Sequence, residues 1–158
     1  MKHKLHELLV FCDMDNTLLT AKAGIPECNR TVMQLFRRMG GRLTVASGRP
    51  PAAVKAALGD LKLSLPAICC NGSLLYDFSS GRVLRRAALN REQAVAAMLD
   101  MAAKFPGIGM EVMAGDGDMY VVQANPYTHA HQVDEGMSGV ACPIDSVPDG
   151  WAKVVFAG

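Results

Sequence analysis

The sequence lacks an excess of charge of either sign, and it lacks any long apolar run. Its 158 residues include 16 basic and 15 acidic side chains, so their formal charges nearly cancel. This balance argues against a basic surface for nucleic acid and against an acidic tail. Because no stretch approaches the roughly 18 apolar residues of a transmembrane helix, we expect no membrane partner. Half of the residues are hydrophobic, which indicates a folded globular protein rather than a disordered one.

The cysteines lack the spacing of a zinc site, and their number is odd. The sequence contains five of them and no C-x-x-C pair: Cys12, Cys28, Cys69, Cys70 and Cys142. Cys12 and the adjacent Cys69 and Cys70 lie in short apolar runs that we interpret as buried strands. Buried, unpaired cysteines are typical of a reducing compartment. No signal-peptide pattern is present, so we expect a cytoplasmic protein.

The first half of the sequence alternates short apolar runs with helical patterns. Residues 8–12, 42–46 and 66–70 predict three buried parallel strands, and the spacing in 28–39 and 50–58 predicts helices between them. This alternation predicts an α/β fold built on part of a doubly wound, Rossmann-like parallel sheet. Ligands of such sheets bind at the carboxyl ends of the strands.

The second half changes character near residue 82. We predict a hairpin that leaves the sheet, a helix, a second hairpin, a loose stretch and a final strand, at residues 74–88, 92–104, 109–124, 125–150 and 151–157. We therefore expect residues 1–82 to form one unit and residues 83–158 to form a second, α+β unit.

Two aspartates follow the first predicted strand. In Asp13-Met14-Asp15 the carboxylates lie two residues apart at a strand end, where both can reach the same cavity. One can attack a phosphoryl phosphorus, and the other can protonate the leaving oxygen and then activate water. Because like charges this close repel, the pair favours a divalent cation, and Mg²⁺ would also neutralise the phosphate. Asp13 and Asp15 are therefore candidate catalytic residues and metal ligands.

Polar residues follow the next two strands as well. Ser47-Gly48-Arg49 lies at a strand-to-helix turn, where a hydroxyl and backbone N–H groups can bind a phosphate. Asn71-Gly72 ends the third strand. Because both segments lie at the same sheet edge as Asp13, we assign all five residues to phosphate or substrate binding.

In this order and spacing, the segments DMDNTLLT, LTVASGRP and ICCNGSLLYD resemble the Cof-like, type IIB cap branch of the haloacid dehalogenase (HAD) superfamily. The resemblance covers residues 8–124 well and the remainder loosely. It implies that Asp13 forms an aspartyl-phosphate and that Asp15 is the general acid/base, with its main-chain carbonyl also on Mg²⁺. It further implies that Ser47 binds phosphate, that Asn71 faces the substrate, and that residues 83–158 are part of a type II cap. Asn16 replaces the family's common glycine.

Two parts of the family's pattern have no counterpart in the sequence. The family's third motif, a lysine, and its fourth, an acidic loop that completes the metal site, come after the cap. Here Lys153 lies in an apolar run that reads as a strand within the cap. The family's sheet takes further strands from that later part, so we expect the Asp13 strand to be an open edge, available to a second copy or a partner chain. We therefore expect this chain alone to hydrolyse small phosphomonoesters, such as phosphosugars or nucleotides, weakly or not at all.

Other interpretations remain open. The chain could be a catalytically silent domain that binds phosphate, Mg²⁺ or a partner, or it could be a phosphomutase, which shares the aspartyl-phosphate chemistry. Ser47 could be a plain helix N-cap, Arg49 a surface residue, and Asn71-Gly72 an ordinary turn.

Two polar clusters in the second half have simple explanations. Asp116-Gly117-Asp118 lies between two apolar runs, so we expect a hairpin turn rather than the missing acidic motif. His129 and His131 lack a matching Cys/His set, so we expect solvated loop residues rather than metal ligands.

Overall fold

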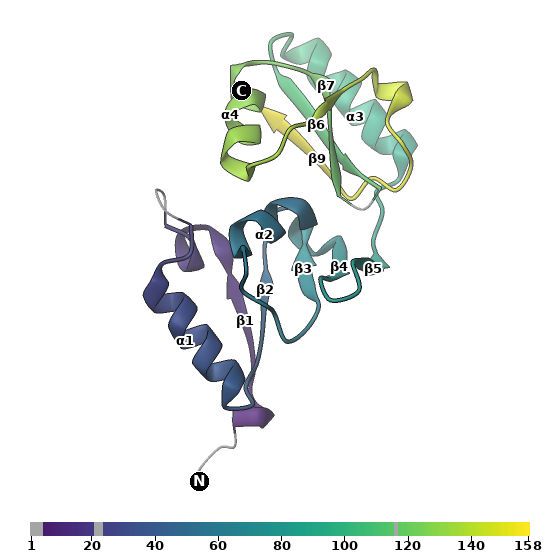
Figure 1. Ribbon diagram of the computed structural model, residues 1–158. Coiled ribbons are helices and arrows are strands. Elements are labelled where there is room, and N and C mark those ends of the chain that lie inside the picture. The colour runs from purple at the N-terminus through teal and green to yellow at the C-terminus, as the bar shows by residue number, and fades with distance from the viewer. Residues whose placement is uncertain (1–4, 21–23, 116) are drawn as a thin grey trace.

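A computed structural model describes residues 5–20, 24–115 and 117–158. The chain folds into two units that each combine a sheet with helices, and α1 and α3 lie at opposite ends of the molecule (Figure 1). The first unit contains η1 (Leu5–Glu7), β1 (Leu9–Asp13), η2 (Met14–Leu18), α1 (Glu27–Arg38), β2 (Arg42–Ala46), α2 (Pro51–Leu58), β3 (Ala67–Cys69), η3 (Cys70–Gly72), β4 (Leu74–Asp77) and β5 (Arg82–Arg86). The second contains α3 (Arg91–Lys104), β6 (Gly109–Ala114), β7 (Asp118–Gln123), α4 (Pro126–Glu135), β8 (Val140–Ala141), η4 (Ile144–Ser146) and β9 (Lys153–Ala157).

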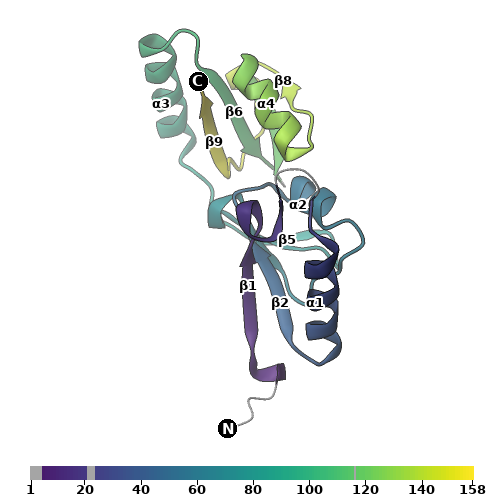
Figure 2. The same ribbon diagram turned by 90° about the vertical axis from the view of Figure 1, so that its left-hand side faces the viewer.

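The first sheet has the order β1-β2-β3-β4-β5. Its first three strands are parallel, as predicted, and α1 lies along one side of them (Figure 2). The hairpin β4–β5 does not leave the sheet: β4 pairs antiparallel with β3, and Leu74 lies opposite Cys69. The reason is the tight turn η3, which returns the chain directly alongside β3. Because β5 completes this sheet, we propose that the boundary between the units lies in residues 87–90.

β1 forms where it was predicted, but it is not buried. Leu9 is 44% exposed and Phe11 is 52% exposed, whereas Val45 of β2 is fully buried. β1 is the edge strand, so among the described residues it has a neighbouring strand on one side only. Cys12 is likewise only partly buried, while Cys69 and Cys70 are buried as expected.

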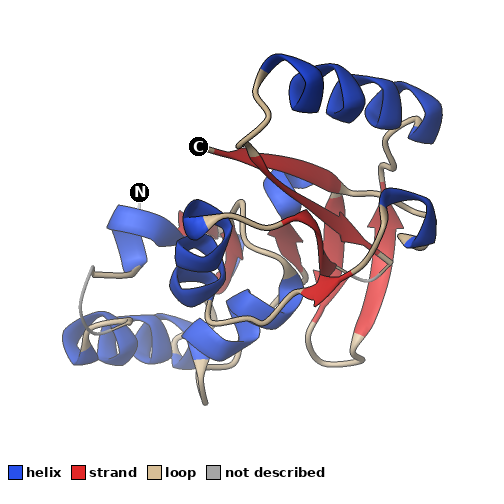
Figure 3. Ribbon diagram, turned by 90° about the horizontal axis from the view of Figure 1, so that it is seen from above, coloured by secondary structure: helices blue, strands red, loops and turns tan. Residues whose placement is uncertain are grey.

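The second sheet has the order β8-β7-β6-β9. β6 and β7 form the expected hairpin, and β9 pairs antiparallel with β6 on its other side. Seen from above, helices flank the strands of both units (Figure 3). No helix among the described residues is long and apolar enough to cross a membrane.

The stretch 125–150 is not loose, because it contains α4. Asn125 is the N-cap of this helix. Its side chain accepts a hydrogen bond from the Thr128 N–H, and the Thr128 hydroxyl accepts one from the Asn125 N–H. Pro126 occupies the first turn, where a missing N–H costs nothing. The prediction placed Asn125-Pro126 in a loose stretch, whereas the pair starts a helix.

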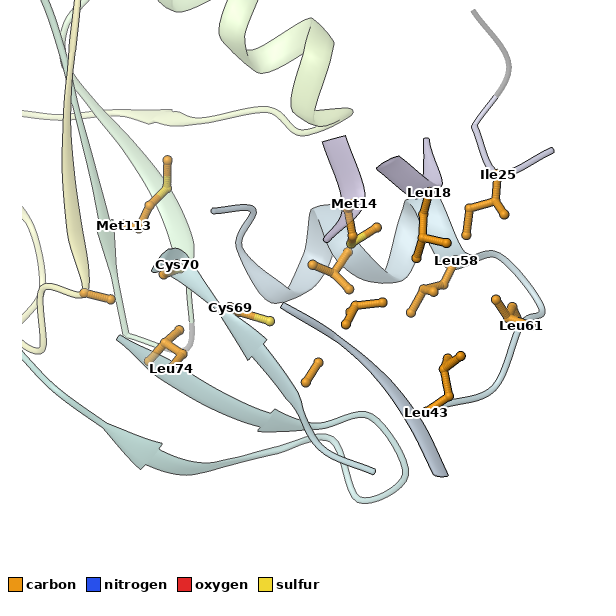
Figure 4. Packing of buried hydrophobic residues seen from close by; sticks show 14 of the residues in the cluster. Met14, Leu18, Ile25, Leu43, Leu58, Leu61, Cys69, Cys70, Leu74 and Met113 are labelled. Atoms are coloured by element: carbon orange, nitrogen blue, oxygen red, sulfur yellow. The ribbon is translucent and has the colours of Figure 1, made fainter. Parts of the chain in front are cut away.

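The two units share one hydrophobic core. Met113, Met119 and Ala152 of the second unit belong to the same buried cluster as Met14 and Val45 of the first. Figure 4 shows Met113 beside Cys70 and Leu74, which lie at the end of β3 and the start of β4. A separate cluster around Met98, Val112 and Trp151 fills the second unit. The shared cluster therefore fixes the second unit over the carboxyl ends of the first sheet.

Candidate functional site

Five of the seven predicted site residues line one cavity. Asp13 lies beside Ala46 in the sheet, and Ala46 lies beside Ile68, so the loops after β1, β2 and β3 start at the same edge. The cavity between them has a volume of about 280 Å³, and it is lined by Asp13, Ala46, Ser47, Gly48, Ile68, Asn71 and Gly72. The parallel register thus brings together residues that are up to 59 positions apart (72 minus 13).

Unusual backbone conformations lie beside this cavity. Among the described residues other than glycine, φ is positive at Asn16 (57°), Cys70 (50°) and Asn71 (57°). Asparagine tolerates this left-handed conformation better than most residues, which explains how Asn16 can replace a glycine. Cys70 is strained there, at a cost of roughly 1–3 kcal/mol. All three lie in the turns that follow β1 and β3, where the backbone must expose Asp13 and Asn71.

Gly48 allows the loops after β2 and β3 to approach each other. A Cβ added at this position would lie 2.7 Å from Oδ1 of Asn71, so any other residue would force the Asn71 side chain to shift. The loops are also joined through their backbones, because Asn71 N–H donates to the Ser47 carbonyl and Cys70 N–H donates to the Arg49 carbonyl. Asn71-Gly72 is thus a turn that also lines the cavity.

Ser47 is not the N-cap of the following helix. α2 begins at Pro51, with Pro50 as its N-cap and no capping bond from a side chain. Instead, the buried Ser47 hydroxyl accepts the Arg49 N–H at 3.1 Å. The loop hydrogen bond therefore orients this hydroxyl at the cavity wall.

Asp15 and Arg49 line a second, neighbouring cavity of about 660 Å³, together with the end of α4. Arg49 donates three hydrogen bonds to the Asp15 carboxylate: Nε donates to Oδ1 at 3.1 Å and to Oδ2 at 3.2 Å, and Nη2 donates to Oδ1 at 2.8 Å. The Arg49 side chain is 14% exposed, so it is not the surface residue that one interpretation allowed. The hydrogen bonds that Arg49 donates to Asp15 raise the pKa of Arg49; burial opposes this rise, and the charges of Glu135, Asp15 and Asp134 add to it.

Arg49 also bridges the two units. Its Nη1 donates to the Asp134 carbonyl at 2.9 Å and lies 3.4 Å from Oε2 of Glu135, at the end of α4. Nearby, the β6–β7 turn packs on the start of α2. The approach is close: a Cβ added at Gly117 would lie 2.5 Å from Cδ of Pro51. Asp116 lies outside the described residues, so the structure does not test its prediction as a hairpin residue. The second unit therefore forms one wall of the larger cavity.

His131 is not a solvated loop residue. It lies in α4, its Nδ1 makes a short hydrogen bond with Oε2 of the fully buried Glu111, and its Nε2 lies 3.4 Å from Glu135 Oε1. The hydrogen bond to Glu111, followed by that to Glu135, raises the pKa of His131 to about 9. His129, on the same helix, is exposed. Within the described part, Glu111 Oε1 and Glu135 Oε2 have no hydrogen-bond donor. A protonated His131 compensates the buried charge of Glu111, and it shares with Arg49 the compensation of Glu135.

Sequence reasoning missed three contributors to the site: Glu135, His131 and Lys153. Nζ of Lys153 donates to the Gly48 carbonyl at 3.1 Å, across the interface between the units. No spacing in the sequence links residues 48 and 153. Only the shared core of the two units brings them together.

The groups at the first cavity include carboxylate oxygens, the type of ligand that magnesium prefers. Mg²⁺ takes hard oxygen ligands and keeps several waters, so one or two carboxylates suffice. Asp13 offers its carboxylate there, and among the described side chains it accepts a hydrogen bond from Thr17 alone, at 3.3 Å. The Asp15 carboxylate is engaged by Arg49, so Asp15 would contribute through its main-chain oxygen. Nowhere in the described ranges do three His, Cys, Asp or Glu side chains form a ready metal cluster.

Comparison with known proteins identifies the family. The model of the haloacid dehalogenase-like hydrolase family matches residues 10–145. Pyridoxal phosphate phosphatase YbhA of Escherichia coli is 36% identical over 76 residues, which are 48% of this chain and 28% of that protein. A haloacid dehalogenase-like hydrolase from Bacteroides thetaiotaomicron superposes with a TM-score of 0.77 at 20% identity, over 95% of this chain and 57% of that one. The subclass IIB sugar phosphatase BT4131 superposes with a TM-score of 0.70 at 21% identity, over 85% of this chain and 52% of that one. The chain thus spans about a quarter of that curated relative and about half of these structures.

Proposed function

The chain belongs to the haloacid dehalogenase-like hydrolase family, and on that premise we propose that it derives from a magnesium-dependent phosphatase whose nucleophile is Asp13. The observation that carries the proposal is the cavity at the end of β1. There Asp13 faces the Ser47 hydroxyl, the Gly48 backbone and the Asn71 turn. A nucleophilic carboxylate opposite a phosphate-sized set of hydrogen-bonding groups suits phosphoryl transfer, in which positioning and electrostatics supply most of the catalysis.

The proposed reaction has two steps. A carboxylate oxygen of Asp13 attacks phosphorus, the ester P–O bond breaks, and the leaving alcohol takes a proton from Asp15. In the second step Asp15 removes a proton from water, which attacks the phosphorus of the aspartyl-phosphate and releases inorganic phosphate and the free Asp13 carboxylate. Mg²⁺ bound by the Asp13 carboxylate and the Asp15 main-chain oxygen would neutralise the phosphoryl oxygens.

Arg49 must release Asp15 during this cycle. A carboxylate whose oxygens accept three guanidinium hydrogen bonds is not free to contact the leaving group. We infer that the arrangement described here is the resting one. When substrate enters, its leaving group takes the place of Arg49 beside Asp15.

The larger cavity supports a small organic leaving group. Its volume of about 660 Å³ lies within the roughly 300–1,000 Å³ range of small-molecule sites. Its polar lining, from Asp15, Arg49, Asp134 and Glu135, suits a hydroxyl-rich phosphosugar or a nucleotide. We place the reaction in the cytoplasm, which the five free cysteines support.

The experiment is hydrolysis of p-nitrophenyl phosphate with and without magnesium, by the natural chain and by Asp13→Asn purified identically. Magnesium-dependent turnover that disappears in Asp13→Asn is the expected result for a working site. Equal, negligible rates in both proteins would refute phosphatase activity of this chain. A panel of phosphosugars, nucleotides and pyridoxal phosphate then identifies the substrate class.

A second candidate function is a catalytically silent domain that binds phosphate and pairs with another chain. The exposed edge strand favours it, because Leu9 and Phe11 are about half exposed and open strand edges are templates for pairing. A concentration-dependent dimer in sedimentation experiments that Phe11→Lys abolishes would support this candidate. A monomer at every concentration would contradict pairing between copies.

A further inference from the structure

Lys153 crosses from the second unit to the phosphate loop. It is the first residue of β9, where its Cα pairs with Met113, and the preceding Ala152 is buried in the shared core. The backbone is therefore fixed beside the interface. From there the flexible side chain reaches 3.1 Å from the carbonyl of Gly48, the central residue of Ser47-Gly48-Arg49.

Among the described residues, no carboxylate serves this ammonium group as a counter-ion. Its one hydrogen bond within the described part of the chain goes to a neutral carbonyl, and no carboxylate there forms an ion pair with it. Lys153 is also partly buried. An ammonium has three donors, and a partly desolvated charge without a partner is costly. The position therefore favours an anion.

The charge of Lys153 acts on both loops that line the Asp13 cavity. Gly48 belongs to the first loop. In the second, burial raises the pKa of the Cys70 thiol to about 11, the charge of Lys153 opposes this rise, and Glu135 adds to it. The backbone of Cys70 is itself bonded to the Arg49 carbonyl. The ammonium thus faces both loops at the side that the second unit covers.

The neighbouring cation is already engaged. Arg49 divides its donors between Asp15, the Asp134 carbonyl and Glu135. A phosphoryl group beside Asp13 would add two negative charges to a carboxylate that is already there, so it requires positive charge at short range. Lys153 has donors to spare and a stem with four rotatable carbons.

We propose that Lys153 is an anion-binding residue of the Asp13 cavity, whose ammonium turns from the Gly48 carbonyl to the oxygens of a bound phosphoryl group. The inference rests on the proposed function, because it assumes that phosphate binds beside Asp13. It assigns to the second unit a direct part in binding the phosphoryl group, in addition to its contact with the leaving group. Docking of the two units then completes the phosphate site.

The test is binding of inorganic phosphate in the presence of magnesium, measured by calorimetry on the whole chain. Lys153→Gln keeps a donor for the Gly48 carbonyl and removes the charge, whereas Lys153→Arg keeps the charge. We expect Lys153→Gln to weaken phosphate binding about tenfold or more and to reduce its salt dependence, and Lys153→Arg to stay within about threefold of the natural chain. Lys104→Gln is the matched control, because Lys104 is exposed and pairs with Asp100 far from the cavity.

Two outcomes separate this inference from the proposed function. If Ser47→Ala loses phosphate while Lys153→Gln binds it as the natural chain does, Lys153 merely ties the units together and the inference is overturned, although the phosphate site stands. If the natural chain binds no phosphate, or if neither variant changes its affinity, both the inference and the phosphate site fail. Thermal unfolding of each variant checks that a loss of binding is not a loss of fold.

Discussion

Replacing His131 by glutamine tests the buried charge network most directly. Folding raises the pKa of His131 from 6.5 to about 9, chiefly through the hydrogen bond to Glu111. The folded protein therefore holds this proton more tightly than the unfolded chain does. Its stabilising contribution is fully present below the unfolded pKa of 6.5 and is lost as the pH rises through about 9.

The size of the effect follows from the shift. At about 1.4 kcal/mol per pKa unit, a shift of this size contributes at most about 3 kcal/mol. The His131 side chain is 23% exposed and Glu111 is fully buried, so solvent screens only part of the interaction. We expect the free energy of unfolding of the natural chain to fall by roughly 1–3 kcal/mol between about pH 6 and pH 9.5 through this residue alone.

The assay is urea unfolding across that pH range for the natural chain, His131→Gln and His129→Gln. His129 lies on the same helix and is exposed, so its variant should keep the pH dependence of the natural chain. The thiols of Cys69 and Cys70, whose pKa values burial raises, also titrate at high pH. They are present in all three proteins, so the difference between variants removes their contribution.

His131→Gln should be less stable than the natural chain at pH 6, by about 3 kcal/mol or more, because Glu111 loses its charged partner inside the protein. It should also lose most of the decline toward pH 9.5. If its stability falls with pH as steeply as that of His129→Gln, the proton does not reside on His131 and the network is misassigned.

Three further perturbations act on single contacts. Asn125→Ala removes the cap of α4 and should lower the free energy of unfolding by about 1 kcal/mol, measured by urea unfolding against Asn29→Ala, whose asparagine lies inside α1 and is only partly exposed. Gly48→Ala places a methyl group 2.7 Å from Oδ1 of Asn71; it should weaken phosphate binding about tenfold by separating the two loops, and unchanged calorimetric affinity would contradict their close approach. Arg49→Lys loses the bidentate hydrogen bonds to Asp15, and a lysine cannot bridge both units as a guanidinium does. The linker after β5 should therefore become more sensitive to limited proteolysis.

The sheet edge could be predicted because local pattern and topology agree there. Short apolar runs that end in Asp13, Ser47 and Asn71 are parallel strands, and parallel strands end at one edge. The prediction needed no knowledge of side-chain contacts. Burial of β1 could not be inferred in the same way. An apolar run shows that a strand is able to pack against other elements, but it does not show which elements are present to cover it. Phe11 is apolar and half exposed for this reason.

The contribution of the second unit could not be predicted, because it depends on how two sheets dock. The prediction of a loose stretch over residues 125–150 missed α4, although Asn125-Pro126 is a strong helix start. Without that helix, Glu135 and His131 had no defined place. Even with it, nothing in the sequence shows that residues 134 and 135 end beside Arg49.

The docked arrangement distributes charge unevenly between the two cavities. Around Asp15, carboxylates outnumber cations: Asp15 and Glu135 both contact Arg49, and Asp134 adds its carbonyl. Around Asp13, the second unit supplies instead the ammonium of Lys153, which contacts no carboxylate among the described residues. A phosphate ester has the complementary distribution, with its charge on the phosphoryl group and hydroxyl groups on its organic part. Because charges separated by a few ångströms in a partly dry site interact by several kcal/mol, this asymmetry should orient an ester with its phosphorus at Asp13 and its leaving oxygen at Asp15, before any chemistry occurs.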